Sequence, residues 1–328
     1  MPLSLPEMLL IPIMCLVGRL TCNRGRDMNT KFHGFLIVLL LVSGSALFAA
    51  GKSGLSFLKI GAGARAAALG EAFVAVPNAS SASLFWNPAG MVWVDKPQAH
   101  ATYNQWIQDV DHQLASITWP TESGAFGIST IFTSIGGIER RTTATEQPEG
   151  EISANDFTLG LAYARKFDPY AVGIHVKYLY EKIYLETAYG FAADFGVQAA
   201  LGVPGLFAGV AVQNLGYTTE LVNEKIDLPT TIRAGAFYRL PKEIGVSRFA
   251  FTTDFVKIVN QESHLQLGLE VTIGPMILAR GGWMTGYDER SWSAGFGLVL
   301  GPVLMDFAFV PFDSDLGSSQ QFSFLYYF

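Results

Sequence analysis

The feature of this sequence that most constrains its fold is a strict alternation of apolar side chains with polar residues or glycine, repeated along most of the chain. In residues 264–273, one side of the extended segment carries Leu265, Leu267, Leu269, Val271 and Ile273. The opposite side carries polar residues and a glycine, among them Gln266 and Glu270. Because successive side chains of a β-strand point to opposite faces, this period predicts a strand with one apolar face.

Fourteen segments after residue 96 share this pattern, near residues 97–107, 110–119, 123–134, 152–166, 170–182, 187–201, 205–214, 229–240, 247–258, 263–273, 275–284, 290–300, 302–310 and 319–328. Most reach the ~9–11 residues that a transmembrane strand needs, whereas strands most often have ~5–6 residues. A soluble β-sandwich also alternates, but its apolar faces are hidden in a core. In a membrane barrel the apolar face meets lipid and charged residues lie toward the lumen.

The connections between these segments alternate in length. Every second connection is short and contains a proline, namely Pro120, Pro169, Pro204, Pro241, Pro275 and Pro302. The others include the longest and most polar ones, 136–151, 216–227 and 311–318. Short turns at one rim and long loops at the other are typical of outer-membrane barrels, whose short turns face the periplasm.

The sequence therefore predicts an all-β transmembrane fold, a 14-stranded antiparallel outer-membrane β-barrel over residues 97–328, in preference to a soluble sandwich. The assignment of faces predicts that an arginine at Leu267 meets lipid and impairs insertion. It also predicts that an arginine at Gln266, on the lumen face, is tolerated.

Residues 28–50 have the order of a secretory signal peptide: a basic Lys31, an apolar stretch from Phe35 to Val42, and small residues up to Ala50. The alternative is a retained membrane anchor, because an anchor needs ~20 apolar residues and residues 32–51 are uncharged. We interpret residues 1–27 as a start-site extension. Both cysteines, Cys15 and Cys22, precede the expected cleavage site, which leaves no disulfide framework or cysteine metal site in the exported chain.

Composition narrows the partners and the chemistry. Charged residues make up 15%, the net charge is −6, and no run of lysine or arginine is present, so we expect no nucleic-acid partner. The histidines of the exported chain, His100, His112, His175 and His264, stand on separate predicted strands without metal-ligand spacing. We therefore expect no catalytic, cofactor or metal site, and no enzymatic activity.

Residues 51–96 differ from the barrel segments, because they are rich in alanine, glycine and serine. Gly61 and Gly63 imitate a dinucleotide-binding fingerprint, but no acidic residue follows at the ~20-residue distance where one would hold a ribose. Asn87 can cap a short helix that starts at Pro88. The small residues suggest close-packed short helices inside the barrel, and we interpret this segment as an N-terminal plug.

Charged residues occur on the predicted lumen face of several strands: Lys177, Asp194, Arg233, Arg239, Asp254, Glu270, Arg280 and Asp306. We expect them to form an internal charge network that anchors the plug. The alternative is a polar pathway for a substrate.

The chain ends in alternating aromatic residues, Phe322, Phe324, Tyr326 and Phe328. Aromatic residues form girdles at the two membrane interfaces of such barrels. The terminal Phe328 resembles the signal by which the barrel-assembly machinery recognises outer-membrane proteins. Together with the signal peptide, this predicts the outer membrane of a diderm bacterium, with outer-membrane lipid as a partner.

Two parts of the predicted plug resemble a known family. The stretch from Phe57 to Val76, which includes Arg65, and the motif Trp86-Asn87-Pro88-Ala89-Gly90 are similar to the N-terminal signature of the PorV/PorQ family. Further matches are residues 213–216 and the run from Leu228 to Gly235. That family belongs to the FadL-like outer-membrane barrels, in which an Asn-Pro-Ala-Gly segment lies in an N-terminal hatch.

The resemblance implies a fourteen-stranded barrel and one of two roles. The favoured role is a component of type IX secretion that handles exported cargo proteins. The second is FadL-like passage of hydrophobic small molecules. A purely structural outer-membrane protein is a third possibility.

Overall fold

In the computed structural model, the described residues are 54–77, 80–141, 147–221 and 226–328. The predicted start-site extension, the signal peptide and both cysteines lie outside them. Among the described residues, no helix is long and apolar enough to cross a membrane.

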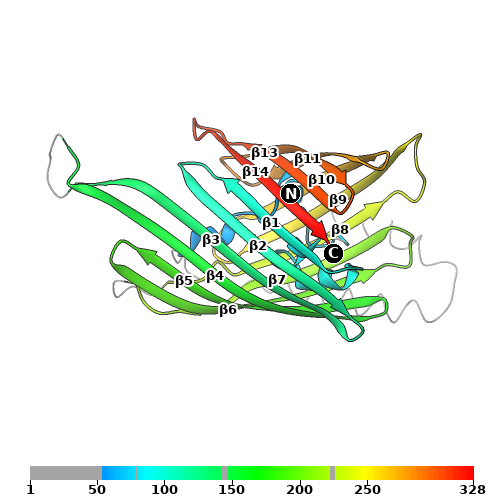
Figure 1. Cartoon of the computed structure of the whole chain (residues 1–328), viewed down its shortest axis with the longest axis horizontal. Coiled ribbons are helices and arrows are strands. Elements are labelled where there is room, and N and C mark those ends of the chain that lie inside the picture. The colour runs from blue at the N-terminus through cyan, green and yellow to red at the C-terminus, as the bar shows by residue number, and fades with distance from the viewer. Residues whose placement is uncertain (1–53, 78–79, 142–146, 222–225) are drawn as a thin grey trace, which may run out of the picture. The chain divides into compact units, whose positions relative to one another are not determined.

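The described part of the chain forms one closed barrel of fourteen antiparallel strands (Figure 1). The strands are β1 (Gln98–Gln105), β2 (Val110–Thr121), β3 (Gly124–Arg140), β4 (Gly150–Phe167), β5 (Tyr170–Ile183), β6 (Glu186–Ala200), β7 (Leu206–Thr218), β8 (Thr231–Arg239), β9 (Ser247–Ile258), β10 (Ser263–Ile273), β11 (Ile277–Thr285), β12 (Trp292–Leu300), β13 (Val303–Pro311) and β14 (Ser318–Tyr327). Each strand pairs with its neighbours in sequence, and β1 pairs with β14, from Gln98 opposite Tyr327 to Gln105 opposite Gln320. The predicted number and order of strands are confirmed.

Several strand ends differ from the prediction by one or two residues, and two strands are clearly longer than predicted. Strand β3 continues to Arg140 instead of ending near residue 134, because a bulge between Ile135 and Ile138 lets it go on pairing with β4. Figure 1 shows the β3–β4 hairpin reaching past its neighbours. Strand β7 likewise continues to Thr218 beyond a bulge opposite Asp194. Pro120 lies within the end of β2 and not in the turn that follows.

As predicted, the outer face of the strands is apolar and the inner face is polar. The inner face, however, is covered by protein and not by water-filled space. On β10, Leu267 on the outer face is 42% exposed, whereas Gln266 on the inner face is fully buried. The lumen is therefore packed with protein and does not resemble a solvated surface. The burial of Gln266 argues against the prediction that an arginine is tolerated there, because the side chain is enclosed by protein.

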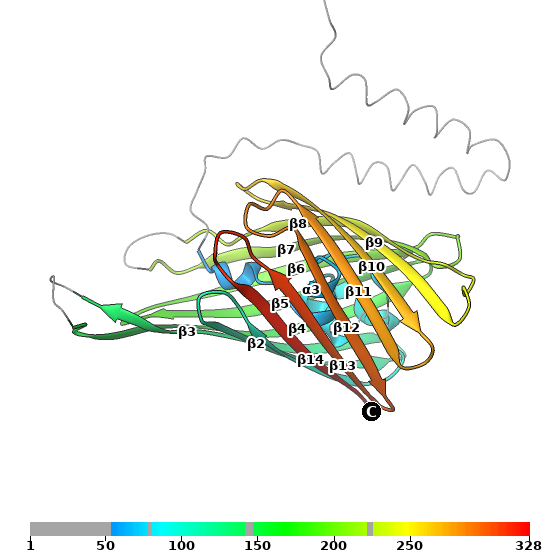
Figure 2. The same cartoon turned by 90° about the horizontal axis from the view of Figure 1, so that it is seen from above.

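The lumen is filled by residues that precede β1. They form η1 (Ser56–Lys59), α3 (Ala64–Ala68), η2 (Ser81–Phe85) and η3 (Pro88–Trp93), and Figure 2 shows α3 inside the ring of strands. The largest apolar cluster joins plug residues such as Phe73 and Trp86 to wall residues such as Leu114 and Leu179. The hydrophobic core of this protein is thus the contact between plug and wall.

Candidate functional site: the plugged lumen

Asn87 links three parts of the molecule through one amide side chain. Its Oδ1 accepts a hydrogen bond from the Ala89 backbone N–H (3.1 Å), which caps η3 as the sequence predicts. Its Nδ2 donates to the carbonyl of Val74 in the plug (2.8 Å) and to the carbonyl of Val197 on β6 (3.1 Å). The motif therefore holds the turns of the plug to each other and to the wall.

Glycines on the inner face allow this close contact. A methyl group on Gly196 would overlap Asn87 Oδ1, and one on Gly173 would overlap the backbone nitrogen of Ala89. Because glycine has no Cβ, the plug backbone can approach β5 and β6 directly. This close contact with the plug explains why glycines on the inner face of these strands alternate with the apolar residues of the outer face.

Arg65 anchors the plug to the wall through an ion-pair chain. Its Nε lies 2.8 Å from Glu270 Oε2, and the same oxygen lies 2.7 Å from Arg280 Nε. Arg280 Nη1 in turn lies 2.6 Å from Asp306 Oδ1. Removing one partner of such a buried chain leaves an uncompensated charge, which costs ~3–5 kcal/mol.

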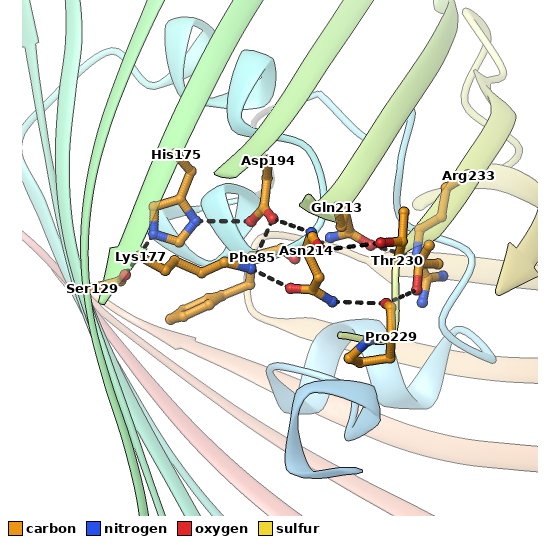
Figure 3. A network of polar contacts seen from close by, with 11 residues as sticks. Phe85, Ser129, His175, Lys177, Asp194, Gln213, Asn214, Pro229, Thr230 and Arg233 are labelled. Carbon is orange, nitrogen blue, oxygen red and sulfur yellow. Dashed lines mark hydrogen bonds and ion pairs between the residues drawn. The ribbon is translucent and has the colours of Figure 1, made fainter. Parts of the chain in front are cut away.

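A second cluster surrounds Asp194 on β6 (Figure 3). Asp194 Oδ1 lies 2.7 Å from Lys177 Nζ and accepts the Asn214 backbone N–H at 2.7 Å. Asn214 has a left-handed backbone (φ 59°) at the bulge of β7. The carboxylate thus satisfies a backbone donor that the bulge removes from the strand ladder.

The same carboxylate lies at the end of a serine–histidine–aspartate row. Ser129 Oγ is 2.8 Å from His175 Nε2, and His175 Nδ1 is 3.1 Å from Asp194 Oδ2. These distances fit a nucleophile, a base and an orienting acid. Ser129 is only 2% exposed, however, and does not line the nearby cavity, which His175 and Asp194 do. The row can therefore fix β3, β5 and β6 to one another, but it offers no room for a scissile bond beside the serine.

The remaining predicted lumen charges do not all pair with one another. Asp254 accepts the backbone N–H groups of Phe73 (2.8 Å) and Val74 (2.9 Å) in the plug. Arg233 donates to Gln213 and Gln266 and lies over the Trp86 ring at 4.7 Å. The charges therefore form separate anchoring points and not one continuous network.

A further plug anchor, Glu71 with Arg290, is missing from the sequence prediction. Arg290 Nη1 lies 2.7 Å from Glu71 Oε1, and the guanidinium lies within 6 Å of the rings of Trp106, Tyr287 and Phe312. Burial raises the pKa of the Tyr287 hydroxyl, so this side chain is neutral at neutral pH. The sequence does single out Glu71, because it and Asp95 are the only acidic residues in 51–96, but it does not indicate that Arg290 is its partner.

Arg239 and Phe328 both lie at the end of the barrel that has the short turns. Arg239 lines a cavity there, which is described below. Phe328 follows β14, donates its backbone N–H to the Pro97 carbonyl (3.0 Å) and has a 61% exposed side chain. The last residue of the chain thus lies at the seam where β14 meets β1.

Within the described residues, no group of three or more histidine, cysteine, aspartate or glutamate side chains could hold a metal ion.

Comparison with known proteins gives one family and one fold. The family model described as "Type IX secretion system protein PorV" matches residues 49–208, from the start of the plug to the first residues of β7. No curated protein matches the chain.

Among solved structures, the toluene transporter TodX of P. putida is similar with a TM-score of 0.56 and 10% identity over 82% of this chain and 99% of that chain. A deltaS2S3 mutant of the TodX monoaromatic hydrocarbon channel gives a TM-score of 0.57 and 10% identity over 81% and 97%. At this identity the likeness shows the fold alone, a closed barrel like that of TodX. The family match covers the plug and the first half of the wall, and over residues 49–208 the chain is similar to the PorV family.

Proposed function

We propose that this outer-membrane barrel is a component of type IX secretion that holds exported cargo proteins at its outer rim. The observation that carries the proposal is the attachment of the plug, together with the PorV family match. A scaffold needs a rigid body with an accessible rim, whereas a transporter needs a plug that can move.

The plug is hydrogen-bonded to strands on several sides of the barrel. The backbone N–H groups of Ala64 and Gly70 donate to Ser323 on β14 (2.8 Å) and Ser293 on β12 (3.1 Å). Trp93 Nε1 donates to Gln198 on β6 (2.9 Å). Each buried partner that loses its bond costs ~1–3 kcal/mol, so moving the plug requires the loss of many bonds at once. This attachment favours a fixed, closed scaffold.

The outer rim offers a surface for a protein partner. The β3–β4 hairpin extends past its neighbours, and its described tip carries exposed charged residues, Glu139, Arg140, Arg141, Glu149 and Glu151. We propose that the long loops face outward and the short turns face the periplasm, as is usual for outer-membrane barrels. The hairpin would then reach the cell surface, where secreted proteins emerge.

The second candidate is passage of hydrophobic small molecules, which the name of the similar TodX structures suggests. The supporting observation is a cavity of about 50 Å³ beside the plug, with Leu58, Ile60 and Phe85 in its lining. One water occupies ~30 Å³ of liquid, so this space admits one or two water-sized groups and no larger solute. Transport would require a displacement of the plug.

The test is a strain that lacks the gene and is complemented with three forms: the wild-type protein, a form with residues 139–151 replaced by Asn-Gly, and a form with Arg65→Ala. The scaffold role predicts that the hairpin form loses secretion of proteins with the type IX sorting domain while hydrophobic solutes enter as in wild type. The transporter role predicts that Arg65→Ala alters solute uptake and leaves secretion intact. Normal secretion in the strain without the gene would contradict the proposal.

We also propose that the protein is not an enzyme, despite the row of Ser129, His175 and Asp194. The burial of Ser129 supports this. A fluorophosphonate probe should leave the folded protein unlabelled, and labelling that disappears in Ser129→Ala would refute the proposal.

A further inference from the structure

The short-turn end of the lumen contains a cavity of about 220 Å³ with four arginines in its lining. Arg239 and Arg248 come from the ends of β8 and β9, Arg280 from β11 and Arg65 from the plug. One carboxylate, Glu270, shares this lining. This cavity shares no lining residue with the smaller cavity beside the plug.

Two of the four arginines are neutralised within the protein. Arg65 and Arg280 both contact Glu270, and Arg280 also contacts Asp306. Two positive charges therefore meet two negative charges. This part of the cavity wall carries no net charge.

Arg239 and Arg248 carry charge that the protein does not balance. In the described residues, Arg239 has no ion pair; Arg65 and Arg248 repel its charge, and Glu270 attracts it without contacting it. Arg248 reaches only Glu243, at 3.6 Å, and both side chains are more than half exposed. An exposed pair of this kind contributes ~0–1 kcal/mol. The cavity thus has an excess of about two positive charges.

Arg280 supplies an independent sign that a partner is missing. Its side chain is fully buried, yet its Nη2 nitrogen has no hydrogen-bond partner within the described residues. A buried guanidinium donor without an acceptor is costly. Arg280 lines the cavity, but this nitrogen is enclosed by protein, so a ligand in the cavity could accept its hydrogen bond only if neighbouring side chains shift.

We propose that this cavity binds a small oxyanion, a carboxylate or phosphate group, which enters from the short-turn side. Guanidinium groups match both through paired N–H donors. The volume corresponds to about seven waters at ~30 Å³ each, which is room for the oxyanion and a few more atoms. The other side of the cavity is lined by Leu278, Val299 and Leu304, so those atoms should be apolar.

This site lies at the opposite end of the barrel from the proposed cargo rim and does not depend on the proposed function. Binding can be measured on the purified, detergent-solubilised full-length barrel, without any secretion partner. If no oxyanion binds, the result of the secretion experiment is unaffected. If the secretion role is disproved, the binding measurement is likewise unaffected.

The experiment titrates the protein separately with inorganic phosphate and with hexanoate, by isothermal titration calorimetry at constant ionic strength in chloride. Constant ionic strength is needed because salt screens such charges. We expect saturable binding of at least one probe. Tighter binding of hexanoate would identify a carboxylate with an apolar tail, and tighter binding of phosphate would identify a phosphate group.

The variant Arg239→Gln should weaken binding by about tenfold or more, because it removes a charge-assisted bond. Arg239→Lys should retain part of the affinity. The matched control is Lys242→Gln, which removes an exposed positive charge from the adjacent turn and does not line the cavity. Its affinity should stay within about twofold of wild type, because an exposed charge at that distance is screened.

Arg239→Gln should fold, because it breaks no ion pair and removes the repulsion from Arg65 and Arg248 together with the attraction to Glu270. Heat-modifiable migration on a gel checks this before the titration. Absence of saturable binding with both probes would overturn the proposal. So would unchanged affinity in folded Arg239→Gln, or an equal loss in Lys242→Gln.

Discussion

Asn87 shows how much of the plug's position depends on single polar side chains. One amide caps η3, bonds to the Val74 carbonyl and reaches the wall at Val197. No apolar residue of the same size could replace these bonds. The Asn-Pro-Ala-Gly motif is therefore explained by geometry inside the barrel.

Replacing Asn87 by alanine should lower the free energy of unfolding by about 1–3 kcal/mol, since it removes a cap and leaves buried groups unsatisfied. Asn87→Asp should cost more, because it also buries a charge. Urea unfolding of the barrel in detergent would measure both. Asn260→Gly is the control, since Asn260 is exposed and has a φ of 66° that glycine adopts readily. Equal stability of Asn87→Ala and wild type would contradict this role.

Asp156 and Glu181 form a like-charged pair on the inner face, directly opposite each other on β4 and β5. Both are buried, and Glu181 Oε2 has no hydrogen-bond partner within the described residues. Glu181→Gln should raise stability by about 0.5–1 kcal/mol, because like charges at this position are destabilising. The thermal midpoint should rise at neutral pH. Glu186→Gln, at an exposed position, should leave it unchanged, and a lower midpoint in Glu181→Gln would contradict the repulsion.

The sequence predicts which charged side chains face the lumen but not their partners. The alternation is local, so it places Glu270, Arg280 and Asp306 on one face from the residues beside each. The contact of Glu270 with Arg65 depends on how the plug docks, and Arg65 lies about two hundred positions away in the chain. Arg290 with Glu71 could not be predicted for the same reason.

At the level of the secondary-structure elements, the outer face of each strand must be apolar where it contacts lipid. Leu267→Arg on β10 should reduce insertion into vesicles, because an arginine at mid-bilayer costs ~2–4 kcal/mol. Leu267→Phe keeps the face apolar and should insert normally. Gln266→Arg should also fail, since Gln266 bonds to Tyr287 and Arg233 in a packed lumen. Normal insertion of Leu267→Arg would mean that this face does not contact lipid.

The two kinds of connection should lie on opposite sides of the membrane. Trypsin added to intact cells should cut at Arg140 or Arg141, at the tip of the β3–β4 hairpin, and should spare Lys242 in a short turn. Opening the outer membrane should expose Lys242, and mass spectrometry of the fragments would identify the sites. Cleavage at Lys242 in intact cells would invert the orientation.

At the scale of the whole molecule, the plug closes a ring that is otherwise wide. Eight strands already enclose a space that side chains just fill, and fourteen enclose more. Deleting residues 80–90 should therefore raise the conductance of the barrel in planar bilayers well above that of the wild type, once heat-modifiable migration shows that the ring has formed. A folded deletion form with wild-type conductance would show that other residues seal the lumen.

The pairing of β1 with β14 sets the order in which the molecule can be completed. The plug precedes β1, yet two of its anchors come late in the chain, Glu270 on β10 and Ser323 on β14, the last strand. During synthesis the plug is made first, and the last strand that it contacts, β14, is made last. The bond from Ala64 to Ser323 can form only once β14 is in place, so we expect the plug to complete its docking as β14 joins β1 and the ring closes.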